Sequence, residues 1–250
     1  MKITVKKYDP SKDAAPYYVS GEIEYREHMS ALEALVEFYE TVEGVNYDLN
    51  CTSAWCGRCA MMLNGEPCLV CVTPVEDAEY VFEPLEGFPV IRDLVVDKNS
   101  MHDRICALSE RVKLEDFTAE TIVPEEFDAT TTAQSLALEE CCRCGVCTAG
   151  CPAKAAHPVE FCGPSEMAAI AYRYLDQLDR GDRVLEAVQH GLYYCIMCGR
   201  CDQNCPHAEI THVELWQRLR DEAEARGLKP SYADDVAAHA EETLQAYLNR

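Results

Sequence analysis

Cysteine dominates the chemistry that this sequence offers, because sixteen of its 250 residues are cysteines. All except Cys106 and Cys162 fall into three groups, at positions 51 to 71, 141 to 151 and 195 to 205. Disulfide frameworks of secreted proteins are seldom grouped in this way, and the first residues lack the apolar segment of an export signal. Grouped, reduced thiols favour bound metal, and their spacing decides which kind.

The first group has the C-x4-C-x2-C spacing, followed by eleven residues and a further cysteine, which is typical of a plant-type 2Fe-2S cluster. Its predicted ligands are Cys51, Cys56, Cys59 and Cys71. Gly57 would let the loop backbone approach the sulfur atoms. A structural zinc site is the alternative, although zinc sites favour paired C-x2-C units. Cys68 is interpreted as a packing residue on a strand.

The second and third groups repeat the run C-x2-C-x2-C-x3-C-P, in which the fourth cysteine ligates the cluster of the other run. One 4Fe-4S cluster is therefore predicted at Cys141, Cys144, Cys147 and Cys205, and a second at Cys195, Cys198, Cys201 and Cys151. Zinc is again the alternative, but a duplicated run with a proline after each last cysteine is hard to explain with tetrahedral zinc. Cys142 is expected to be a packing residue.

No other motif in the sequence indicates a substrate-transforming site. The glycine-rich dinucleotide loop, the P-loop, H-E-x-x-H and the serine nucleophile elbow are all missing from the sequence, so no catalytic residue is assigned. His157 and His207 follow cluster cysteines and could tune a potential or move a proton, although a solvated loop histidine is the simpler interpretation. Arg58 and Arg200 could offset cluster charge or lie exposed at the surface.

The elements that must position these cysteines change in type along the chain. Alternating apolar residues predict strands at 1–8 and 17–25, and further short strands fit 60–63, 68–72 and 80–84. Ser30 and Glu33 form a capping box for a helix that ends at Gly44. Asn64-Gly65 predicts a hairpin turn. This order of elements suits a small β-grasp sheet of the ferredoxin type, over residues 1–100.

Beyond residue 100 the pattern indicates helices and loops. Ser100 and Asp103 suggest a second capping box, and later helices are expected at 165–178, 182–192, 213–226 and 234–248. The predicted fold class is therefore α+β: an N-terminal β-grasp 2Fe-2S domain, followed over 101–250 by an α-helical ferredoxin-like domain that holds the two cubane clusters.

Charge and hydropathy restrict the partners. The formal net charge is −22, which argues against nucleic acid because phosphate binding needs a basic surface. No run of about eighteen apolar residues occurs, so the sequence predicts a chain that does not itself span a membrane and that lies in the cytoplasm.

One 2Fe-2S motif followed by two interleaved cubane motifs resembles the iron-sulfur subunit of the succinate dehydrogenase and fumarate reductase family. The resemblance extends to CGRCAMMLNGEPCLVC, PLEGFPVIRDLVVD and GPSEMAAIAYRYLDQLDRGDR. It implies an FAD-bearing flavoprotein partner, a membrane anchor or soluble redox partner, and electron transfer to or from a quinone or menaquinone. It also implies a peripheral location on the inner face of the cell membrane, through partner subunits.

Two departures from the family pattern matter. Most members lack the second cysteine of the third run and hold a 3Fe-4S cluster there, whereas Cys198 predicts a complete 4Fe-4S cluster of lower potential; a 3Fe-4S cluster stays the alternative. The family also places aromatic residues and a histidine at positions that here read Ala155, Ala156 and Ile196. A low-potential menaquinol, or a thiol or heterodisulfide partner, then becomes an alternative to the usual quinone.

Three functions follow from these patterns. The leading hypothesis is the electron-transfer subunit of a succinate dehydrogenase or fumarate reductase type complex. The second is the same role in a related flavin reductase or dehydrogenase with a different substrate. A neighbouring gene that encodes the flavoprotein would distinguish this hypothesis from the first. The third is a free-standing polyferredoxin carrier, which would purify alone and without flavin.

Overall fold

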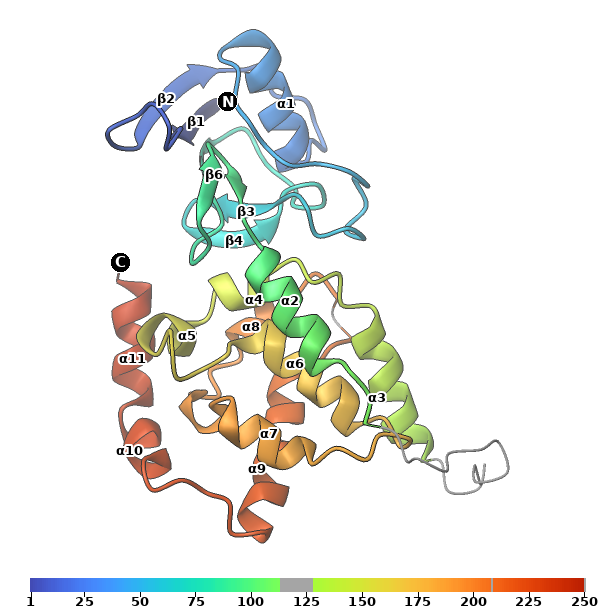
Figure 1. The fold of residues 1–250 in the computed structure, drawn as a ribbon. Coiled ribbons are helices and arrows are strands. Elements are labelled where there is room, and N and C mark those ends of the chain that lie inside the picture. Colours follow the sequence, from blue (N-terminus) through green and yellow to red (C-terminus); the bar gives the residue numbers. More distant parts are fainter. Residues whose placement is uncertain (113–127, 208, 250) are drawn as a thin grey trace. The chain divides into compact units, whose positions relative to one another are not determined.

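The computed structural model of the protein describes residues 1–112, 128–207 and 209–249 (Figure 1). The chain separates into two compact units, one formed by 1–100 with 142–150 and the other by 101–141 with 151–250. The second cysteine run therefore contributes a short segment to the first unit. The simpler expected division at residue 100 stays a prediction.

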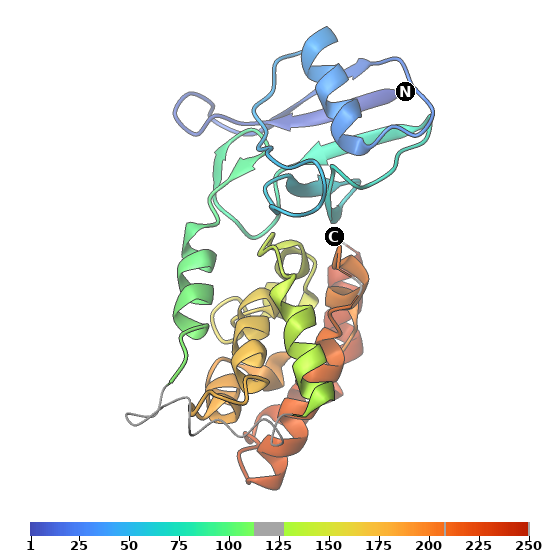
Figure 2. The ribbon, with the colours of Figure 1, turned by 90° about the vertical axis from the view of Figure 1, so that its right-hand side faces the viewer.

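The first unit is built on a five-stranded mixed sheet with the order β2-β1-β5-β3-β4. Strand β1 pairs antiparallel with β2 and parallel with β5, and β3 pairs antiparallel with both β4 and β5. The strands are β1 Lys2–Lys7, β2 Tyr17–Glu22, β3 Ala60–Leu63, β4 Glu66–Leu69 and β5 Glu79–Glu83. Helix α1, Ala31–Thr41, lies across one face of the sheet (Figure 2). The predicted α+β fold with a mixed N-terminal sheet is confirmed.

Alternation of side chains explains the core of this unit. Every second residue of β1 points into it, so Ile3 and Val5 are fully buried, as is Phe82 of β5. The predicted capping box is also confirmed, since the Ser30 hydroxyl accepts the Glu33 N–H at 3.3 Å and the Glu33 carboxylate accepts the Ser30 N–H at 2.7 Å. Helix α1 thereby begins where its apolar face meets the sheet.

A small hairpin of β6, Val90–Arg92, and β7, Val95–Val96, ends the first hundred residues. Its turn holds buried Asp93 at a φ of 47°, and the Asp93 carboxylate accepts the N–H groups of Tyr8 and Asn46 at 3.1 and 2.9 Å. The turn is thus fastened to the segments that follow β1 and α1.

Helices make up the second unit. Helix α2, Asn99–Leu108, lies in this unit from Met101 on. The other helices are α3 Ala129–Glu139, α5 Pro152–Ala156, α6 Pro164–Tyr174, α7 Arg183–Gln189, the short 3-10 helix Leu192–Tyr194, α8 Arg200–Asn204, α9 His212–Ala225, α10 Ala233–Ala238 and α11 Ala240–Leu248. Helix α6 packs against both α7 and α9, and its first eight residues are all buried. Among the described residues, no helix combines the length and apolarity that would cross a membrane.

Several helix boundaries differ from the sequence prediction. Helix α2 begins at Asn99, so Ser100 lies inside the helix and the second capping box is wrong; the Asp97 carboxylate instead accepts the Asn99 N–H. Helix α6 begins after Gly163 with Pro164 at its first position and ends at Tyr174. The expected last helix is two helices, α10 and α11, separated at His239.

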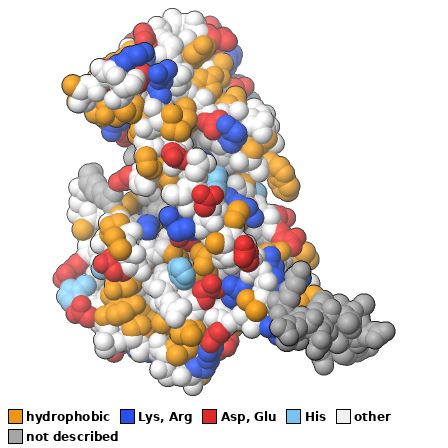
Figure 3. Space-filling model, in the orientation of Figure 1, with side chains coloured by type: hydrophobic (Ala, Val, Ile, Leu, Met, Phe, Trp, Pro, Cys, Tyr) orange, Lys and Arg blue, Asp and Glu red, His pale blue; other side chains and the backbone are white. Residues whose placement is uncertain are grey.

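Acidic side chains lie among basic and apolar ones on the face drawn in Figure 3. Many of the acidic groups are paired, as in the ion pairs of Arg226 with Asp182 and of Lys229 with Asp234 in the second unit. On this face the acidic side chains are therefore interspersed with basic ones.

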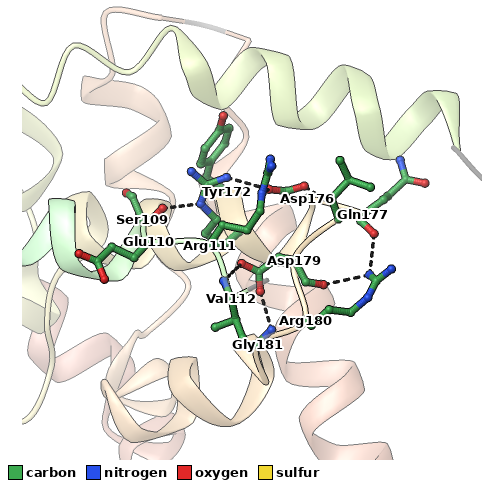
Figure 4. Close-up of polar contacts among 12 residues, drawn as sticks. Ser109, Glu110, Arg111, Val112, Tyr172, Asp176, Gln177, Asp179, Arg180 and Gly181 are labelled. Carbon is green, nitrogen blue, oxygen red and sulfur yellow. Dashed lines mark hydrogen bonds and ion pairs between the residues drawn. The ribbon is translucent and has the colours of Figure 1, made fainter. Parts of the chain in front are cut away.

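A polar cluster holds the end of α2 against the turn that follows α6 (Figure 4). The buried Asp179 carboxylate accepts the N–H groups of Val112 and Gly181 at 3.1 and 2.6 Å, and it pairs with buried Arg183 at 2.9 Å. Burial alone would raise the pKa of Asp179, but these hydrogen bonds outweigh it and hold the pKa below its usual value. One carboxylate thus joins the segment after α2 to the turn that leads into α7.

Replacing Asp179 by Ala should destabilise the full chain by about 2 kcal/mol, because it removes the charged acceptor shared by buried Arg183 and the N–H groups of Val112 and Gly181. Urea unfolding followed by circular dichroism measures the change. The matched control is Asp234→Ala, which removes a carboxylate that is 85% exposed from its pair with Lys229 and should cost at most about 1 kcal/mol. Equal effects of the two variants would contradict this role of Asp179.

The same variant predicts a pH dependence. Because the Asp179 pKa is lower in the folded than in the unfolded protein, its contribution is fully present above the unfolded pKa of about 3.9 and is lost as the pH falls through the folded pKa. The stability difference between wild type and Asp179→Ala should therefore stay constant from about pH 5 to 8 and shrink below about pH 4. A difference that grows on acidification would contradict the assignment.

Candidate iron-sulfur centres

The four predicted 2Fe-2S ligands all lie in the first unit. Cys51, Cys56 and Cys59 lie on the irregular loop that leads into β3, and Cys59 is buried at its end. The sequence predicted Cys71 on a strand, but the residue lies in the turn two residues after β4. The strand is shorter than predicted because the chain turns at Val70. Cys68, interpreted as a packing residue, does lie on β4.

Backbone N–H groups of the loop are directed at the first of these sulfur atoms. Cys51 Sγ accepts the N–H groups of Ser53, Trp55 and Cys56 at 3.5, 3.3 and 3.2 Å. These bonds, that of Ser53 first, lower the pKa of Cys51 to about 6. Thr52 makes this fold-back possible with a left-handed backbone, at a φ of 57°. The loop therefore stabilises a thiolate.

Burial acts in the opposite direction on Cys59, whose pKa it raises to about 12. Burial thus disfavours the charged thiolate of Cys59, which a bound metal would favour. Loop amides directed at sulfur, together with the buried thiol of Cys59 and that of Cys71 from a second segment, fit a 2Fe-2S cluster in which loop N–H groups donate to ligand sulfur.

The loop of the first group meets the segment of the second group within the first unit. Gly57 has a φ of 66°, and a Cβ atom there would lie 2.7 Å from the Cys142 carbonyl oxygen and 2.8 Å from Cys144 Cα. Lys98 bridges the two segments, since its Nζ donates to the carbonyl oxygens of Gly57 at 2.9 Å and of Cys144 at 3.3 Å. Two cysteine-bearing loops are therefore in direct backbone contact.

Ligands predicted for the first cubane are divided between the units. Cys144 and Cys147 belong to the first unit, and both are buried, whereas Cys141 and Cys205 belong to the second. This ligand set stays a prediction.

The four ligands predicted for the second cubane line one small cavity of the second unit. Cys151 comes from the second run, where it lies at the start of α5, and Cys195, Cys198 and Cys201 come from the third run. Other residues that line the cavity are mostly apolar or small: Pro152, Ala153, Pro164, Ile196, Gly199, Arg200, Val213 and Trp216. The structure thus brings together two cysteine runs separated by more than forty residues of sequence.

Backbone conformation repeats between the two runs. Arg143 and Gly145 have left-handed φ values of 53° and 85°, and Met197 and Gly199, at the matching positions, have 55° and 76°. In each run these residues flank the second cysteine and turn the backbone around it. Cys195 Sγ accepts the Met197 N–H at 3.4 Å as one result.

Unpaired donors concentrate beside the third run. Four buried side-chain nitrogens have no hydrogen-bond partner among the described residues, and all four belong to residues 204 to 220. They are Asn204 Nδ2, His207 Nε2, Trp216 Nε1 and Arg220 Nε. Buried polar groups in folded proteins are normally paired, so their collection here fits a cofactor whose sulfur atoms accept hydrogen bonds.

The histidines singled out from the sequence lie beside other aromatic or charged side chains. The His157 ring lies 4.7 Å from the Tyr194 ring, and His207 Nδ1 lies 3.9 Å from a carboxylate oxygen of Glu140. A proton-transfer role for either histidine stays untested.

The two arginines of the CGRC sequences also have partners. Arg58 forms an ion pair with Asp48 at 2.8 Å, and the Arg200 guanidinium lies 5.3 Å from the centre of the Tyr247 ring. Arg200 also lines the cavity of the third run, so it is the better placed of the two to act on a cluster.

Three residues near the cysteines carry no motif and were missed in the sequence. Lys98 follows a strand, and Trp216 and Arg220 lie on the apolar face of α9, where packing explains their type equally well. Their places became visible only when the contacts of the folded chain were known.

A groove beside α5 involves two positions noted in the sequence. Ala155 and Ala156 line an open groove whose other wall is α11, with Glu242, Thr243, Ala246 and Tyr247. Ile196, the third such position, lines the cavity of the four cysteines. The small alanines leave room for α11 to pack against α5.

Two families match the chain. Residues 2–103 match a 2Fe-2S iron-sulfur cluster binding domain, and residues 137–208 match a 4Fe-4S dicluster domain.

Curated relatives cover most of the chain. Fumarate reductase iron-sulfur subunit of Haemophilus influenzae is 31% identical, over 82% of this chain and 86% of that protein. Succinate dehydrogenase iron-sulfur subunit of Bacillus subtilis is 29% identical, over 78% and 81%. A subunit of the fumarate reductase (CoM/CoB) of Methanothermobacter marburgensis is 30% identical over 92% of this chain, which spans only 46% of that protein's length.

A solved structure has the same fold. A chain of the Sdh1 complex of Mycobacterium smegmatis in the apo form superposes with a TM-score of 0.80 at 23% identity, over 92% of this chain and 98% of that one.

Gly57→Ala should disrupt the first cysteine loop, because the added Cβ would press on the backbone at Cys142 and Cys144. The expected result is loss of most 2Fe-2S absorption and visible circular dichroism, with weaker loss of total iron. Gly87→Ala is the matched control: its φ of 82° imposes similar backbone strain, but nothing lies within 4 Å of its added Cβ. Equal spectra for the two variants would show that the close approach is unimportant.

Proposed function

Because the chain belongs to the family of iron-sulfur subunits of fumarate reductases and succinate dehydrogenases, we propose that it is the electron-transfer subunit of such a complex. It passes electrons between an FAD-bearing flavoprotein subunit and a terminal partner, and the substrate chemistry belongs to the flavoprotein. The chain itself carries no substrate-transforming site. Its place on the inner face of the cell membrane, through partner subunits, is part of the same proposal.

One observation carries this proposal. Cys151 of the second run lines the same cavity as Cys195, Cys198 and Cys201 of the third run. Interleaved ligation of this kind is the feature that distinguishes two-cluster ferredoxins from paired zinc sites. It supports two cubanes, the second with four thiolate ligands, and it agrees with the dicluster family that matches residues 137–208.

Each part of the chain has a task in this function. The clusters, when bound, supply one-electron oxidation and reduction. The cysteine thiolates hold them, the N–H groups directed at Cys51 stabilise negative charge on sulfur, and apolar neighbours such as Ile196 and Val213 exclude water. Backbone contact at Gly57 and the Lys98 bridge keep the first loop close to the second run, which favours rapid transfer between the groups they bind.

The terminal partner is the less conventional part of the proposal. Ala155, Ala156 and Ile196 replace the aromatic residues and histidine of the usual quinone site, and α11 packs on α5 there. A second candidate is therefore a complex whose partner subunit or domain exchanges electrons with thiols. The relative from Methanothermobacter marburgensis carries CoM/CoB in its name, and it shares 30% identity with this chain.

Simple observations distinguish two further alternatives from the proposed function. A related flavin reductase or dehydrogenase would share the clusters but accept another substrate, so activity of the purified complex with fumarate, succinate and other enoates distinguishes it. A free-standing polyferredoxin would purify without flavin. Recovery of flavin with the tagged chain, isolated anaerobically from its own cells, supports the subunit and contradicts the carrier.

Iron counting tests the cofactor content. One 2Fe-2S and two 4Fe-4S clusters require ten irons per chain, and the oxidised protein should give no EPR signal of a 3Fe cluster. Nine irons together with that signal would show that Cys198 is not a ligand. A colourless, anaerobically prepared protein that contains zinc would overturn the proposed function.

Cys198→Ser should convert the second cubane into a three-iron centre, because it removes one of the four thiolates at the cavity. EPR of the oxidised variant should show the new signal, with nine irons in place of ten and a higher potential for that cluster. Cys142→Ser is the matched control, since Cys142 is the neighbour of a ligand and is predicted to be a packing residue. If both variants keep ten irons, the role assigned to Cys198 is wrong.

A further inference from the structure

Helix α9 is fixed beside the third cysteine run. The Asp202 carboxylate of α8 accepts the N–H groups of His212 and Val213, the first two residues of α9, and also contacts His212 Nδ1 at 2.9 Å. An acidic group at this end of a helix pairs with its free N–H groups and stabilises it. The residues one and two turns further along α9 are therefore held in a defined position against the run.

Trp216 lies one turn along α9 and has no exposed surface. Its indole lines the cavity with Cys151, Cys195, Cys198 and Cys201, and its Nε1 atom has no hydrogen-bond partner among the described residues. An indole nitrogen can only donate, and a buried donor left without an acceptor destabilises the folded state. The cavity is otherwise lined mainly by apolar side chains, so sulfur is the acceptor that its chemistry offers.

Arg220 lies one further turn along the same face. Its Nη2 atom donates to the carbonyl oxygens of Leu192 and Cys195 at 2.9 and 2.5 Å, and its guanidinium lies 5.1 Å from the centre of the Tyr193 ring. Its Nε atom, like the indole nitrogen, is buried without a partner among the described residues. No described carboxylate forms an ion pair with this cation, so its positive charge is directed to the backbone of a predicted ligand.

We propose that the Trp216 indole N–H donates a hydrogen bond to a sulfur atom of the 4Fe-4S cluster held by Cys151, Cys195, Cys198 and Cys201, and that Arg220 places a positive charge beside the same cluster. This rests on the proposed function, since it requires that cluster. Reduction adds one negative charge to the cluster, and both the donor and the cation stabilise the more negative state. Helix α9 thereby raises the potential of a cluster whose fourth thiolate would otherwise keep it low.

The test removes the N–H group while it keeps the ring system. Replacement of Trp216 by benzothienylalanine substitutes sulfur for the nitrogen in a side chain of nearly the same shape, and Trp216→Phe is the simpler variant. Tyr174→Phe is the matched control, because it also removes a donor from an aromatic ring of the second unit, but this donor binds the Glu222 carboxylate at 2.9 Å and the ring does not line the cavity. The full chain, prepared anaerobically with its clusters, is titrated by EPR.

Both Trp216 variants should keep ten irons and make the second cubane harder to reduce, by about tenfold in the reduction equilibrium, which is about 59 mV for one electron. Tyr174→Phe should leave the potential of that cluster unchanged. Arg220→Lys should retain most of the wild-type potential, whereas Arg220→Met should lower it. In deuterated solvent, pulsed ENDOR of the reduced cluster should show a strongly coupled exchangeable deuteron that the benzothienylalanine variant lacks.

An unchanged potential in the loaded Trp216 variants would overturn the role of Trp216, and so would a wild-type ENDOR spectrum without the deuteron. The second result decides the question even if the variants fail to assemble the cluster. Equal potentials for Arg220→Met and wild type would overturn the role of Arg220. Absence of the cluster from the wild-type protein is a different outcome, because it contradicts the proposed function itself.

Discussion

The geometry of a backbone that turns around a sulfur atom is the constraint on which the rest of the structure depends. Three thiolates can converge from one short segment only if the chain reverses within a few residues, and ordinary right-handed or extended residues do not allow this. Left-handed Arg143 and Gly145 in one run, and Met197 and Gly199 in the other, provide the reversal at matching places. The short helices α4, Val146–Ala149, and α8 follow directly, because each run leaves its turn in helical conformation.

Different parts of the second unit contribute to stability and to function. The face formed by α6, α7 and α9 buries apolar side chains, and Asp179 with Arg183 fastens the neighbouring loops by hydrogen bonds that the protein completes on its own. Residues 204 to 220 instead keep buried donors that no described residue satisfies. A protein tolerates such groups where a cofactor completes them, so folding of this region is expected to depend on the cofactor.

Residue type and spacing predicted much of this fold and of its site. The cysteine runs, the strands around Ile3 and the capping box at Ser30 depend on neighbours within a few residues, and the sequence contains that information. Cys71 in a turn and the roles of Lys98 and Trp216 depend on contacts between distant segments. A tryptophan on an apolar helix face gives no sign in the sequence that its N–H group lacks a partner.

Contact between the loop at Gly57 and residues 142–150 has a consequence for exchanging parts between homologues. The first unit is discontinuous in sequence, since it includes that later segment as well as residues 1–100. A chimaera joined at residue 100 would combine a loop from one parent with the surface at Cys142 and Cys144 from the other, and the space at Gly57 tolerates little mismatch. The natural module for recombination is therefore a pair of segments, which must be inherited together.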